Sequence, residues 1–500
     1  MPPKQALPLS PTVTQIAKLL PADQTVYLVG GALRDALLGR LNHDLDFVLV
    51  GDVYAVARRL ADQLGGAFYP LDPRRNYARI ILRQPGEPRQ VLYFAPLAGH
   101  DLESDLRQRD FTINAIAVAV HDLDRRFDPL GGAADLHAKR LRACSPTAFQ
   151  QDPLRILRAV RLAFAFTLNI VPDTRTRMRQ AVPELRETSP ERLRDELFRI
   201  LEGTLPGAAL RALEMFGALE IILPELCALK GVEQPPPHVS DAWEHTLTVI
   251  NRLEDLLQAL APAYDPDKAA NLAAGLVVMR LGRYRQQFAE HFSQALNVER
   301  SPRGLLFLAA LYHDSGKPEM RQVDENGRIR FFDHEQSSLR LVEQRLLDLH
   351  MSNLETERVK TIVRHHMRPL LLAQLASPPT RRATYRFFRD CGAAGVDICL
   401  LALADMLATY GPNLPTEAWE KQVDVVRALL EAWWERPAEQ VSPPAILDGH
   451  DLMEVFQQAP GAHIGEQLAA VREAQATGLV RTREEALDFV RKMNEQSGGT

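Results

Sequence analysis

Apolar residues follow two different patterns, and the change between them comes near residue 142. Before that point, short apolar runs predict strands over 27–29, 44–50, 68–71, 77–82 and 90–94. Helical spacing predicts helices over 14–20, 32–38, 53–64 and 134–139, and a charged helix that turns apolar over 101–120. Farther on, the same spacing predicts helices over 151–166, 189–201 and 416–435, and two or three more over 446–492.

These elements predict an α+β fold in which only the first part of the chain contains a sheet. We expect a small α/β head over 11–142, a helical neck over 143–230, a helical domain over 238–412 and a helical tail over 413–494. The proline-rich stretch GVEQPPPH marks the boundary between the neck and the helical domain.

The segment YLVGGALRDALLGRLNHDLD, at 27–46, has the most specific pattern in the head. A buried strand is closed by Gly30 and Gly31, a short helix follows, and a second strand begins at Asp44. Alternate side chains of a strand share a face. Asp44 and Asp46 therefore project together, while the apolar residues between and after them face the core.

Two carboxylates on one face repel each other and are stable there mainly with a cation between them, for which Mg²⁺ is well suited. This arrangement indicates two-metal nucleotidyl transfer. The Gly30-Gly31 turn lets backbone N–H groups approach a triphosphate, and Arg34 lies one turn into the helix, within reach of the same phosphates. The alternative is an ordinary tight turn beside a solvated strand edge. The combination of both motifs in this order favours a functional site.

Composition narrows the classes of function further. Apolar residues make up 46% and charged residues 25% of the 500 positions, as in a globular protein of several domains. A net charge of −5 leaves no global basic field, so an RNA-binding surface must be local. The four cysteines lack metal-ligand spacing, and we expect them reduced and buried. No signal peptide is visible and no apolar run approaches membrane-spanning length, so we expect a cytoplasmic protein without a membrane partner.

The motifs GGALRD and HDLD resemble the signature of the tRNA nucleotidyltransferase and bacterial poly(A) polymerase family, the class II nucleotidyltransferases. A second motif, RDFTINA, is similar to the same family. This resemblance implies that Arg109, Asp110 and Asn114 contact the sugar and phosphates of the incoming nucleotide. From the residues alone, Arg109 and Asp110 could equally form an ion pair at a helix terminus.

The segment QDPLRILRAVR predicts a basic helix in which Asp152 is a natural N-cap and Pro153 takes the first position. Arg155, Arg158 and Arg161 then form one stripe, which could be a solvated helix face. The resemblance implies instead the nucleotide-recognition helix of the family. There Asp152 and Arg155 would bond the Watson–Crick edge of ATP or CTP, with Arg158 beside them.

The basic stretch DTRTRMRQ resembles the part of the neck that grips the acceptor end of tRNA. Arg175, Arg177 and Arg179 are candidate phosphate contacts there, although a charge run of this kind is more often only solvated.

The helical domain contains scattered but ordered metal ligands and the motif HDSGKP, and it resembles the HD superfamily of metal-dependent phosphohydrolases. The resemblance implies one metal bound by His245, His313, Asp314 and Asp405. His334 would complete a second site with one of His365 and His366, for which we take His365. Imidazole and carboxylate ligands suit a divalent transition metal better than Mg²⁺.

The chain departs from the family pattern in three places. Relatives usually carry an acid where this chain has Tyr93, and another where Gln151 precedes Asp152. The segment 94–101 is short, which resembles enzymes that add only part of the CCA tail, such as CC.

Together, the patterns and the resemblance predict a nucleotidyltransferase head followed by an all-helical neck, an HD domain and a helical tail. The predicted reaction is Mg²⁺-dependent addition of CMP and/or AMP, from CTP and ATP, to the tRNA 3′ end, with Asp44 and Asp46 as catalytic residues. Three alternatives stay open: a poly(A) polymerase, a phosphohydrolase with an RNA-binding head, and a non-catalytic RNA-binding protein.

Overall fold

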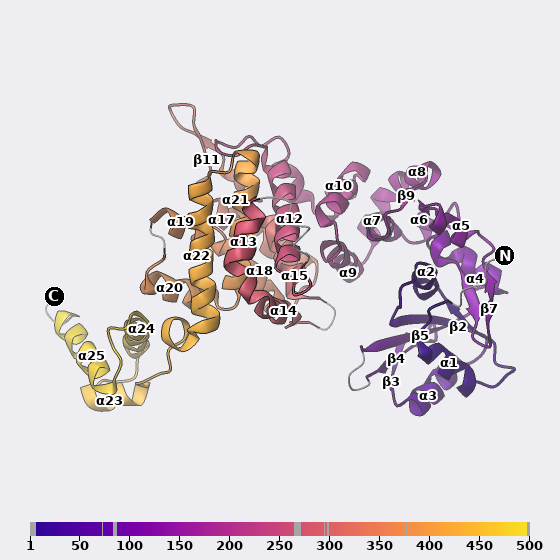
Figure 1. Ribbon diagram of the computed structural model, residues 1–500, viewed down its shortest axis with the longest axis horizontal. Coiled ribbons are helices and arrows are strands. Elements are labelled where there is room, and N and C mark those ends of the chain that lie inside the picture. Colours follow the sequence, from indigo (N-terminus) through magenta and orange to yellow (C-terminus); the bar gives the residue numbers. More distant parts are fainter. Residues whose placement is uncertain are drawn as a thin grey trace. The chain divides into compact units, whose positions relative to one another are not determined.

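The computed structural model describes residues 7–72, 74–83, 88–264, 272–294, 296–297, 300–375 and 378–497. The chain forms two compact units (Figure 1). The first contains the chain up to Ser189 together with Ala212–Ile221, and the second contains Pro190–Arg211 and the chain from Ile222 on. The division falls inside the predicted neck, so each unit takes a share of the neck helices.

The first unit is organised around a seven-stranded sheet in the order β3-β4-β5-β2-β1-β6-β7. Strands β2 and β5 are parallel, and the other neighbouring pairs are antiparallel. The strands are β1 Val26–Val29, β2 Asp44–Leu49, β3 Ala67–Asp72, β4 Tyr77–Leu82, β5 Gln90–Pro96, β6 Ala117–Ala119 and β7 Asp122–Phe127, with a separate pair, β8 Arg140–Leu141 and β9 Asn169–Ile170. Its helices are α1 Pro11–Leu19, α2 Gly31–Leu37, α3 Val53–Leu64, α4 Leu102–Gln108, α5 Gly132–His137, α6 Ala148–Gln151, α7 Arg155–Ala165 and α8 Pro172–Ala181, and the 3₁₀ turns are η1 Thr112–Asn114 and η2 Val182–Glu187.

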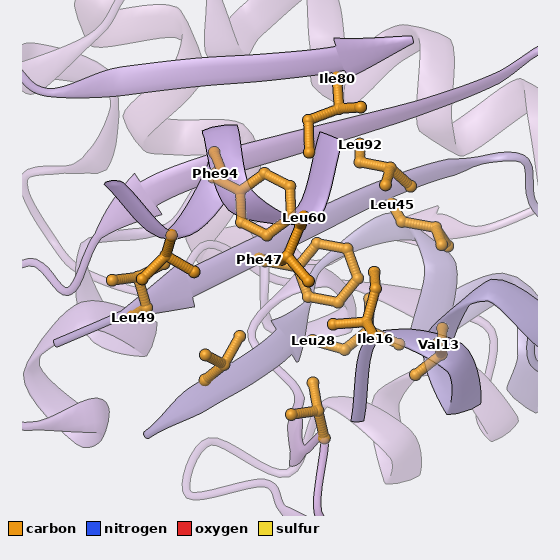
Figure 2. Close-up of a cluster of buried hydrophobic side chains, with 14 of the residues drawn as sticks. Val13, Ile16, Leu28, Leu45, Phe47, Leu49, Leu60, Ile80, Leu92 and Phe94 are labelled. Carbon is orange, nitrogen blue, oxygen red and sulfur yellow. The ribbon is translucent and has the colours of Figure 1, made fainter. Parts of the chain in front are cut away.

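One core cluster of the head lies on the face of the sheet to which Leu45, Phe47 and Leu49 of β2 point (Figure 2). Asp44 and Asp46 alternate with these residues along the strand and project from the other face. Phe47 of β2 stacks on Phe94 of β5 with ring centroids 4.9 Å apart, and Leu60 of α3 packs against the same layer. The in–out alternation of β2 therefore fixes which side of the strand meets the core and which side is left for chemistry.

All five predicted strands are confirmed, but two expectations for the head are wrong. The stretch 101–120, predicted as one helix, forms three elements: α4 ends at Gln108, and η1 and β6 follow it. β7 was not expected, since most of its residues are charged and lie at the edge of the sheet.

The second unit is helical, apart from a small pair of strands within the described part of the chain. Its helices are α9 Pro190–Leu201, α12 Ala242–Ala259, α13 Leu272–Leu281, α14 Arg285–Ser293, α15 Pro302–Tyr312, α16 Lys317–Met320, α17 His334–Asp348, α18 Asn353–His365, α19 Arg368–Leu375, α20 Arg381–Cys391, α21 Ala394–Tyr410, α22 Thr416–Glu435, α23 Gly449–Phe456, α24 Ala462–Thr477 and α25 Arg483–Ser497. The short strands are β10 Gln322–Val323 and β11 Ile329–Arg330. Two further neck helices, α10 Pro206–Phe216 and α11 Leu219–Ile222, span the division between the units. The stretch 446–492, for which we expect two or three helices, forms three, α23 to α25.

The expectation that no apolar run approaches membrane-spanning length is wrong. The segment Ala394–Asn413 has a mean hydropathy of 1.4 and is long enough to cross a membrane, and 72% of that window is buried inside the protein. Helix α21 is apolar on all sides because it lies in the interior of the helical domain. The cysteines differ from expectation in part: Cys391 and Cys399 are buried, whereas Cys144 and Cys227 are only half-buried.

Candidate functional site

Strand β2 places the two predicted catalytic carboxylates on one face of the sheet. Asp44 is exposed and Asp46 is half-buried, while the residues that alternate with them are buried. In the register of the sheet, Asp46 lies between Val29 of β1 and Tyr93 of β5. Burial raises the pKa of Asp46 and the charge of Asp44 adds to this, whereas the Arg109 guanidinium lowers it. A cation between the two carboxylates would relieve this repulsion.

Gly30 brings the backbone close to Asp46. Its φ of +78° is in the left-handed region, and a Cβ there would lie 3.2 Å from Oδ2 of Asp46 and 3.4 Å from Nη1 of Arg109. A Cβ on Gly31 would lie 3.4 Å from Nη2 of Arg34. The two glycines therefore keep the space between Asp46 and the guanidinium groups free of side-chain carbon.

A chain of hydrogen bonds connects α7 to α2 through the 3₁₀ turn η1. Arg158 donates from Nε and Nη2 to Oδ2 of Asp110, at 3.0 and 2.6 Å. Oδ1 of Asp110 accepts from Nδ2 of Asn114 at 3.0 Å, and Oδ1 of Asn114 accepts from Nη1 of Arg34 at 2.8 Å. Arg34 also donates to Oδ1 of Asp35 at 2.9 Å. Four of the predicted nucleotide-binding residues, Arg34, Asp110, Asn114 and Arg158, thus form one charge-balanced network together with Asp35.

Arg34 itself is only 8% exposed, and its guanidinium lies over the ring of Phe166, 4.2 Å from the centroid. Burial lowers its pKa, although Asp35 opposes the shift. These contacts hold the side chain in place under the Gly30-Gly31 turn rather than in solvent.

Arg109 is held by a different carboxylate. It donates from Nε and Nη2 to Oδ2 of Asp105, at 3.0 and 2.9 Å, and Oδ1 of Asp105 accepts from the backbone N–H of Ala98 at 3.0 Å. The alternative of a plain ion pair between Arg109 and Asp110 is wrong, since each has its own partner. Asp105 was missed by the sequence reasoning; its spacing of four residues before Arg109 on a helix was the available signal.

The expected N-cap role of Asp152 is wrong. Asp152 ends α6 in an extended conformation, and α7 begins at Arg155 with Leu154 at the N-cap. The residue before a proline avoids the helical region, which explains the break. Arg155 donates to the backbone carbonyls of Ala148 and Gln108, at 3.1 and 2.8 Å, so it connects the start of α7 to α6 and to the end of α4.

Helix α8 does not present its three arginines on one face. Arg175 and Arg179 are exposed and four residues apart, whereas Arg177 lies on the opposite side. Arg177 is paired with Asp173 at 2.8 Å and donates to the carbonyl of Pro146 at 3.0 Å. Arg175 and Arg179 are therefore the two that face solvent.

The helical domain gathers the predicted metal ligands from five helices in its interior. Nε2 of His245 lies 3.0 Å from Oδ1 of Asp405 and 3.6 Å from Oδ2 of Asp314. Nε2 of His313 and Nε2 of His334 lie 3.2 Å from the two oxygens of Asp314. The first four-residue set is thus brought together as expected.

The second set contains His366 and not His365. His366 is 2% exposed. The centroid of its ring lies 5.2 Å from the ring centroid of His313 and 5.6 Å from that of His334. His365 is half-exposed and lies outside both groups of potential metal ligands, Asp314 with His245 and His313, and Asp314 with His334 and His366. Neighbouring residues of a helix point about 100° apart, so only one of the two can face the interior.

The tautomers of these histidines suit metal binding. Nδ1 of His313, His334 and His366 each lies 2.7–2.9 Å from the backbone carbonyl three residues earlier. A carbonyl only accepts, so Nδ1 carries the proton and Nε2 presents a lone pair. Nε2 of His366 has no hydrogen-bond partner among the described residues, and Nε2 of His313 and of His334 face the carboxylate of Asp314. This donor set fits a divalent metal ion.

Two further polar residues of this centre were missed. Lys317 lies 2.6 Å from Oδ2 of Asp314 and donates to Oε1 of Gln234 at 2.6 Å. The ring of His238 lies 5.2 Å from that of His245, and burial, with the nearby Lys317, lowers the pKa of His238 to about 4. The lysine stands three residues after Asp314 in the HDSGKP motif, which was a readable signal.

Comparison with known proteins agrees with this architecture. Residues 26–142 match the poly A polymerase head domain, residues 167–230 the probable RNA and SrmB-binding site of polymerase A, and residues 243–409 the HD domain. An A-adding tRNA nucleotidyltransferase of Deinococcus radiodurans is 33% identical over 95% of this chain and 96% of its own length. A CC-adding tRNA nucleotidyltransferase of Thermus thermophilus is 34% identical over 92% of each chain.

The chain belongs to the tRNA nucleotidyltransferase family. Solved structures of CCA-adding enzymes share its fold: one in complex with CTP has a TM-score of 0.59 at 21% identity over 97% of this chain and 96% of the other. The Thermotoga maritima enzyme complexed with tRNA has a TM-score of 0.54 at 20% identity over 96% and 94%. The chain is thus a nucleotidyltransferase with an α+β fold and an HD domain, and the family implies use of a divalent metal.

In this nucleotidyltransferase, Tyr93 stands in the register position directly beside Asp46. The resemblance leads us to expect a third acid at this position. The head instead places the phenol of Tyr93 next to the two carboxylates.

Proposed function

We propose that this nucleotidyltransferase adds CMP, AMP or both to the 3′ end of tRNA. The observation that carries the proposal is the placement of Asp46 on the same face as Asp44 and against the backbone of Gly30. The relatives that match nearly the whole chain, named as A-adding and CC-adding tRNA nucleotidyltransferases, support the same substrate.

Asp44 and Asp46 would hold Mg²⁺ in the head, because carboxylate oxygens are the ligands that this ion prefers. When bound, the ions would supply charge stabilisation for the attacking and leaving oxygens. The protein's own contribution is to fix both carboxylates on a rigid strand, with a buried core behind them.

The triphosphate would bind at the Gly30-Gly31 turn, where no Cβ obstructs it and the guanidinium groups of Arg109 and Arg34 both lie close to the backbone. Arg34 would support the turn from below. Asp110 already accepts four hydrogen bonds, including one from the backbone of Phe111 at 2.7 Å, which fill its acceptor sites. It would act by holding Arg158 and Asn114 in position beside the sugar and phosphates.

Base selection would fall to Asp152, which ends α6, and Arg155, the first residue of α7, which supply a carboxylate acceptor and a guanidinium donor three positions apart. Arg155 reaches this position through its bonds to two backbone carbonyls, which fix the guanidinium plane. On the neck, Arg175 and Arg179 would contact RNA phosphates, since they are exposed on one side of α8.

The extent of addition would be partial. Only five residues separate β5, which ends at Pro96, from α4, which begins at Leu102. Asp105 anchors this connection through the backbone of Ala98. A connection so short and so tied supports addition of only part of the CCA tail.

The HD centre favours a second activity, hydrolysis of a phosphate ester with a divalent transition metal. Its support is the set of Nε2 lone pairs around Asp314. A chromogenic phosphodiester assay, with Mn²⁺, Ni²⁺ and Zn²⁺ added in turn, tests this activity; hydrolysis unchanged by Asp314→Asn would exclude it.

The main proposal is tested by incubating the protein with labelled CTP or ATP and either tRNA lacking its tail or unstructured RNA. We expect addition to tRNA that is lost in Asp44→Ala and kept in Asp62→Asn, which removes an exposed carboxylate of the same head. Incorporation of AMP but not CMP into both RNAs would indicate a poly(A) polymerase. Full activity of Asp44→Ala would defeat the site assignment.

A further inference from the structure

A buried ion pair connects helices α18 and α21 of the helical domain. Arg358 of α18 pairs through Nη2 with Oδ2 of Asp397 on α21. Asp397 is 0% exposed, and the side chain of Arg358 is 13% exposed. Nε2 of His291, on α14, lies 3.1 Å from Oδ1 of Asp397 and 3.0 Å from Nη2 of Arg358. None of the three residues lies in the nucleotide site or among the predicted metal ligands.

On each of the two helices, a predicted metal ligand follows the ion pair at the same spacing. His366 stands eight residues after Arg358, and Asp405 stands eight residues after Asp397. Eight residues of α-helix span about 12 Å. At that distance from the pair, the ring of His313 lies 5.2 Å from the ring of His366, and its Nε2 lies 3.9 Å from Oδ1 of Asp405. The helices are therefore connected at two levels, by the ion pair and by the metal centre.

Helices α18 and α21 contribute to different halves of that centre. His366 belongs to one group of potential ligands, with Asp314 and His334, whereas Asp405 lies 3.0 Å from Nε2 of His245 in the other group. Asp314 is common to both groups. A shift of α18 along α21 would move His366 relative to Asp405, and so would change the separation of the two metal positions. A working centre needs such distances fixed to about 0.5 Å.

Apolar packing alone fixes the offset between these helices only weakly. Helix α21 is apolar on all sides, and its two charged residues are Asp397 and Asp405. The aliphatic residues buried on α18 are Val359, Ile362 and Val363. Aliphatic cores tolerate rearrangement at small cost and lose a unique arrangement before they lose stability. A buried ion pair specifies the offset much more strongly, because a slip would leave an unpaired charge in the interior.

We propose that the Arg358–Asp397 pair positions the two halves of the HD metal centre: it fixes α18 against α21, so that His366 and Asp405 hold two metal ions that share Asp314. The inference rests on the proposed metal-dependent activity of this centre and adds two positioning residues to it. Such a pair need not stabilise the fold more than apolar residues of similar size would. Positioning can therefore be separated from stability by experiment.

The test uses Mn²⁺ and the full-length protein carrying Asp44→Asn and Asp46→Asn, so that the head does not hold the ion. Two Mn²⁺ ions that share a carboxylate are spin-coupled, and their EPR spectrum lacks the hyperfine sextet of an isolated ion. We expect the coupled spectrum from this parent once excess metal is removed. Adding Arg358→Met and Asp397→Leu should leave the melting temperature close to that of the parent. It should weaken binding of at least one ion about tenfold and bring out the sextet.

Arg358→Lys keeps the buried charge paired, so it reports even if the apolar double variant does not fold. Its ammonium lacks the planar guanidinium that lies between Asp397 and His291, and it should weaken Mn²⁺ binding to a smaller extent. Arg280→Met with Asp424→Leu is the control, because it removes an ion pair between α13 and α22, which hold none of the predicted ligands.

Unchanged Mn²⁺ binding and a coupled spectrum in a folded Arg358 variant would show that the pair only stabilises the fold, and would overturn the inference. The coupled spectrum of the parent would then leave the proposed metal centre standing. A parent that binds no Mn²⁺ at the HD centre would overturn both.

Discussion

Arg158 on α7 and Asp110, two residues before the η1 turn, form a salt bridge in which both donor nitrogens share one carboxylate oxygen. Asp110 is 7% exposed and also holds Asn114, so the pair joins the helix that would read the base to the turn that would hold the sugar. Two segments 48 residues apart in the sequence are fixed to one another by this contact.

Replacing Arg158 by Ala should therefore loosen the nucleotide site. Asp110 would lose both hydrogen bonds from Arg158, and we expect a loss of about 2 kcal/mol in the free energy of unfolding of the head. The specificity constant kcat/KM for nucleotide should fall roughly 10- to 100-fold, mainly through KM. Arg107→Ala removes an exposed arginine that is paired with Glu103 on the surface of α4 and should change neither quantity. Equal effects of the two substitutions would contradict the assigned role.

Asp110 should also make the head sensitive to acid. Burial raises its pKa, but Arg158, Asn114 and the backbone of Phe111 outweigh burial and lower the pKa to about 2. The pKa is lower in the folded than in the unfolded state, so the pair stabilises the head above about pH 4 and this contribution disappears as the pH falls toward 2.

The loss between pH 4 and pH 2 should be about 2 kcal/mol smaller in Asp110→Asn than in wild type. The four tryptophans of the chain all lie beyond residue 242, so fluorescence does not report on the head. Hydrogen exchange of peptides from α4 to β6 measures it directly, with Asp62→Asn as the control. Parallel pH profiles of wild type and Asp110→Asn would refute this prediction.

Gly30 should be more sensitive to substitution than Gly39, a glycine with a similar positive φ. Gly30 and Gly39 have φ of +78° and +72°, but only at Gly30 would a Cβ meet other atoms, Oδ2 of Asp46 among them. Both alanine variants should lose about 1 kcal/mol of stability from backbone strain.

Only Gly30→Ala should also lose turnover, by roughly tenfold or more, because the Cβ displaces the carboxylate. Thermal denaturation measures the loss of stability in both variants, and kcat measures the loss of turnover. A similar loss of kcat in Gly39→Ala would show that backbone strain, and not contact with Asp46, is responsible.

His366 and His365 offer a matched pair for the metal centre. His366→Ala should weaken binding of Mn²⁺ or Zn²⁺ roughly tenfold or more, since it removes a buried Nε2 ligand, whereas His365→Ala should bind the metal as wild type does. Metal content after dialysis, measured by mass spectrometry, distinguishes them. Greater loss in His365→Ala would mean that α18 is rotated relative to the structure described here.

The sequence predicted those features that depend on local periodicity. The alternation in HDLD placed Asp44 and Asp46 on one face, and helix α3 and strand β4 have the bounds that the pattern predicts. Features that depend on partners far along the chain were not predictable in this way. The charged pattern of β7 reads as a loop until β6 is available to pair with it, and the break before Arg155 depends on where α6 ends.

The candidate sites also combine features that the sequence predicts with features that depend on packing. The resemblance named Asp110, Asn114 and Arg158, but no pattern said that they bond to each other or that Arg34 is buried against Phe166. Likewise, adjacent histidines leave the choice of ligand open until the rotation of α18 is known. Spacing gives the residues, and packing decides which of their atoms meet.

The central claim is that the carboxylate pair of the head, and not the histidine cluster, adds nucleotides to tRNA. The direct measurement is sequencing of tRNA 3′ ends after incubation with CTP, ATP or both, for wild type, Asp46→Asn and Asp314→Asn side by side. We expect wild type and Asp314→Asn to add the same residues and Asp46→Asn to be slower by roughly a thousandfold or more. Addition abolished in Asp314→Asn and intact in Asp46→Asn would contradict the account.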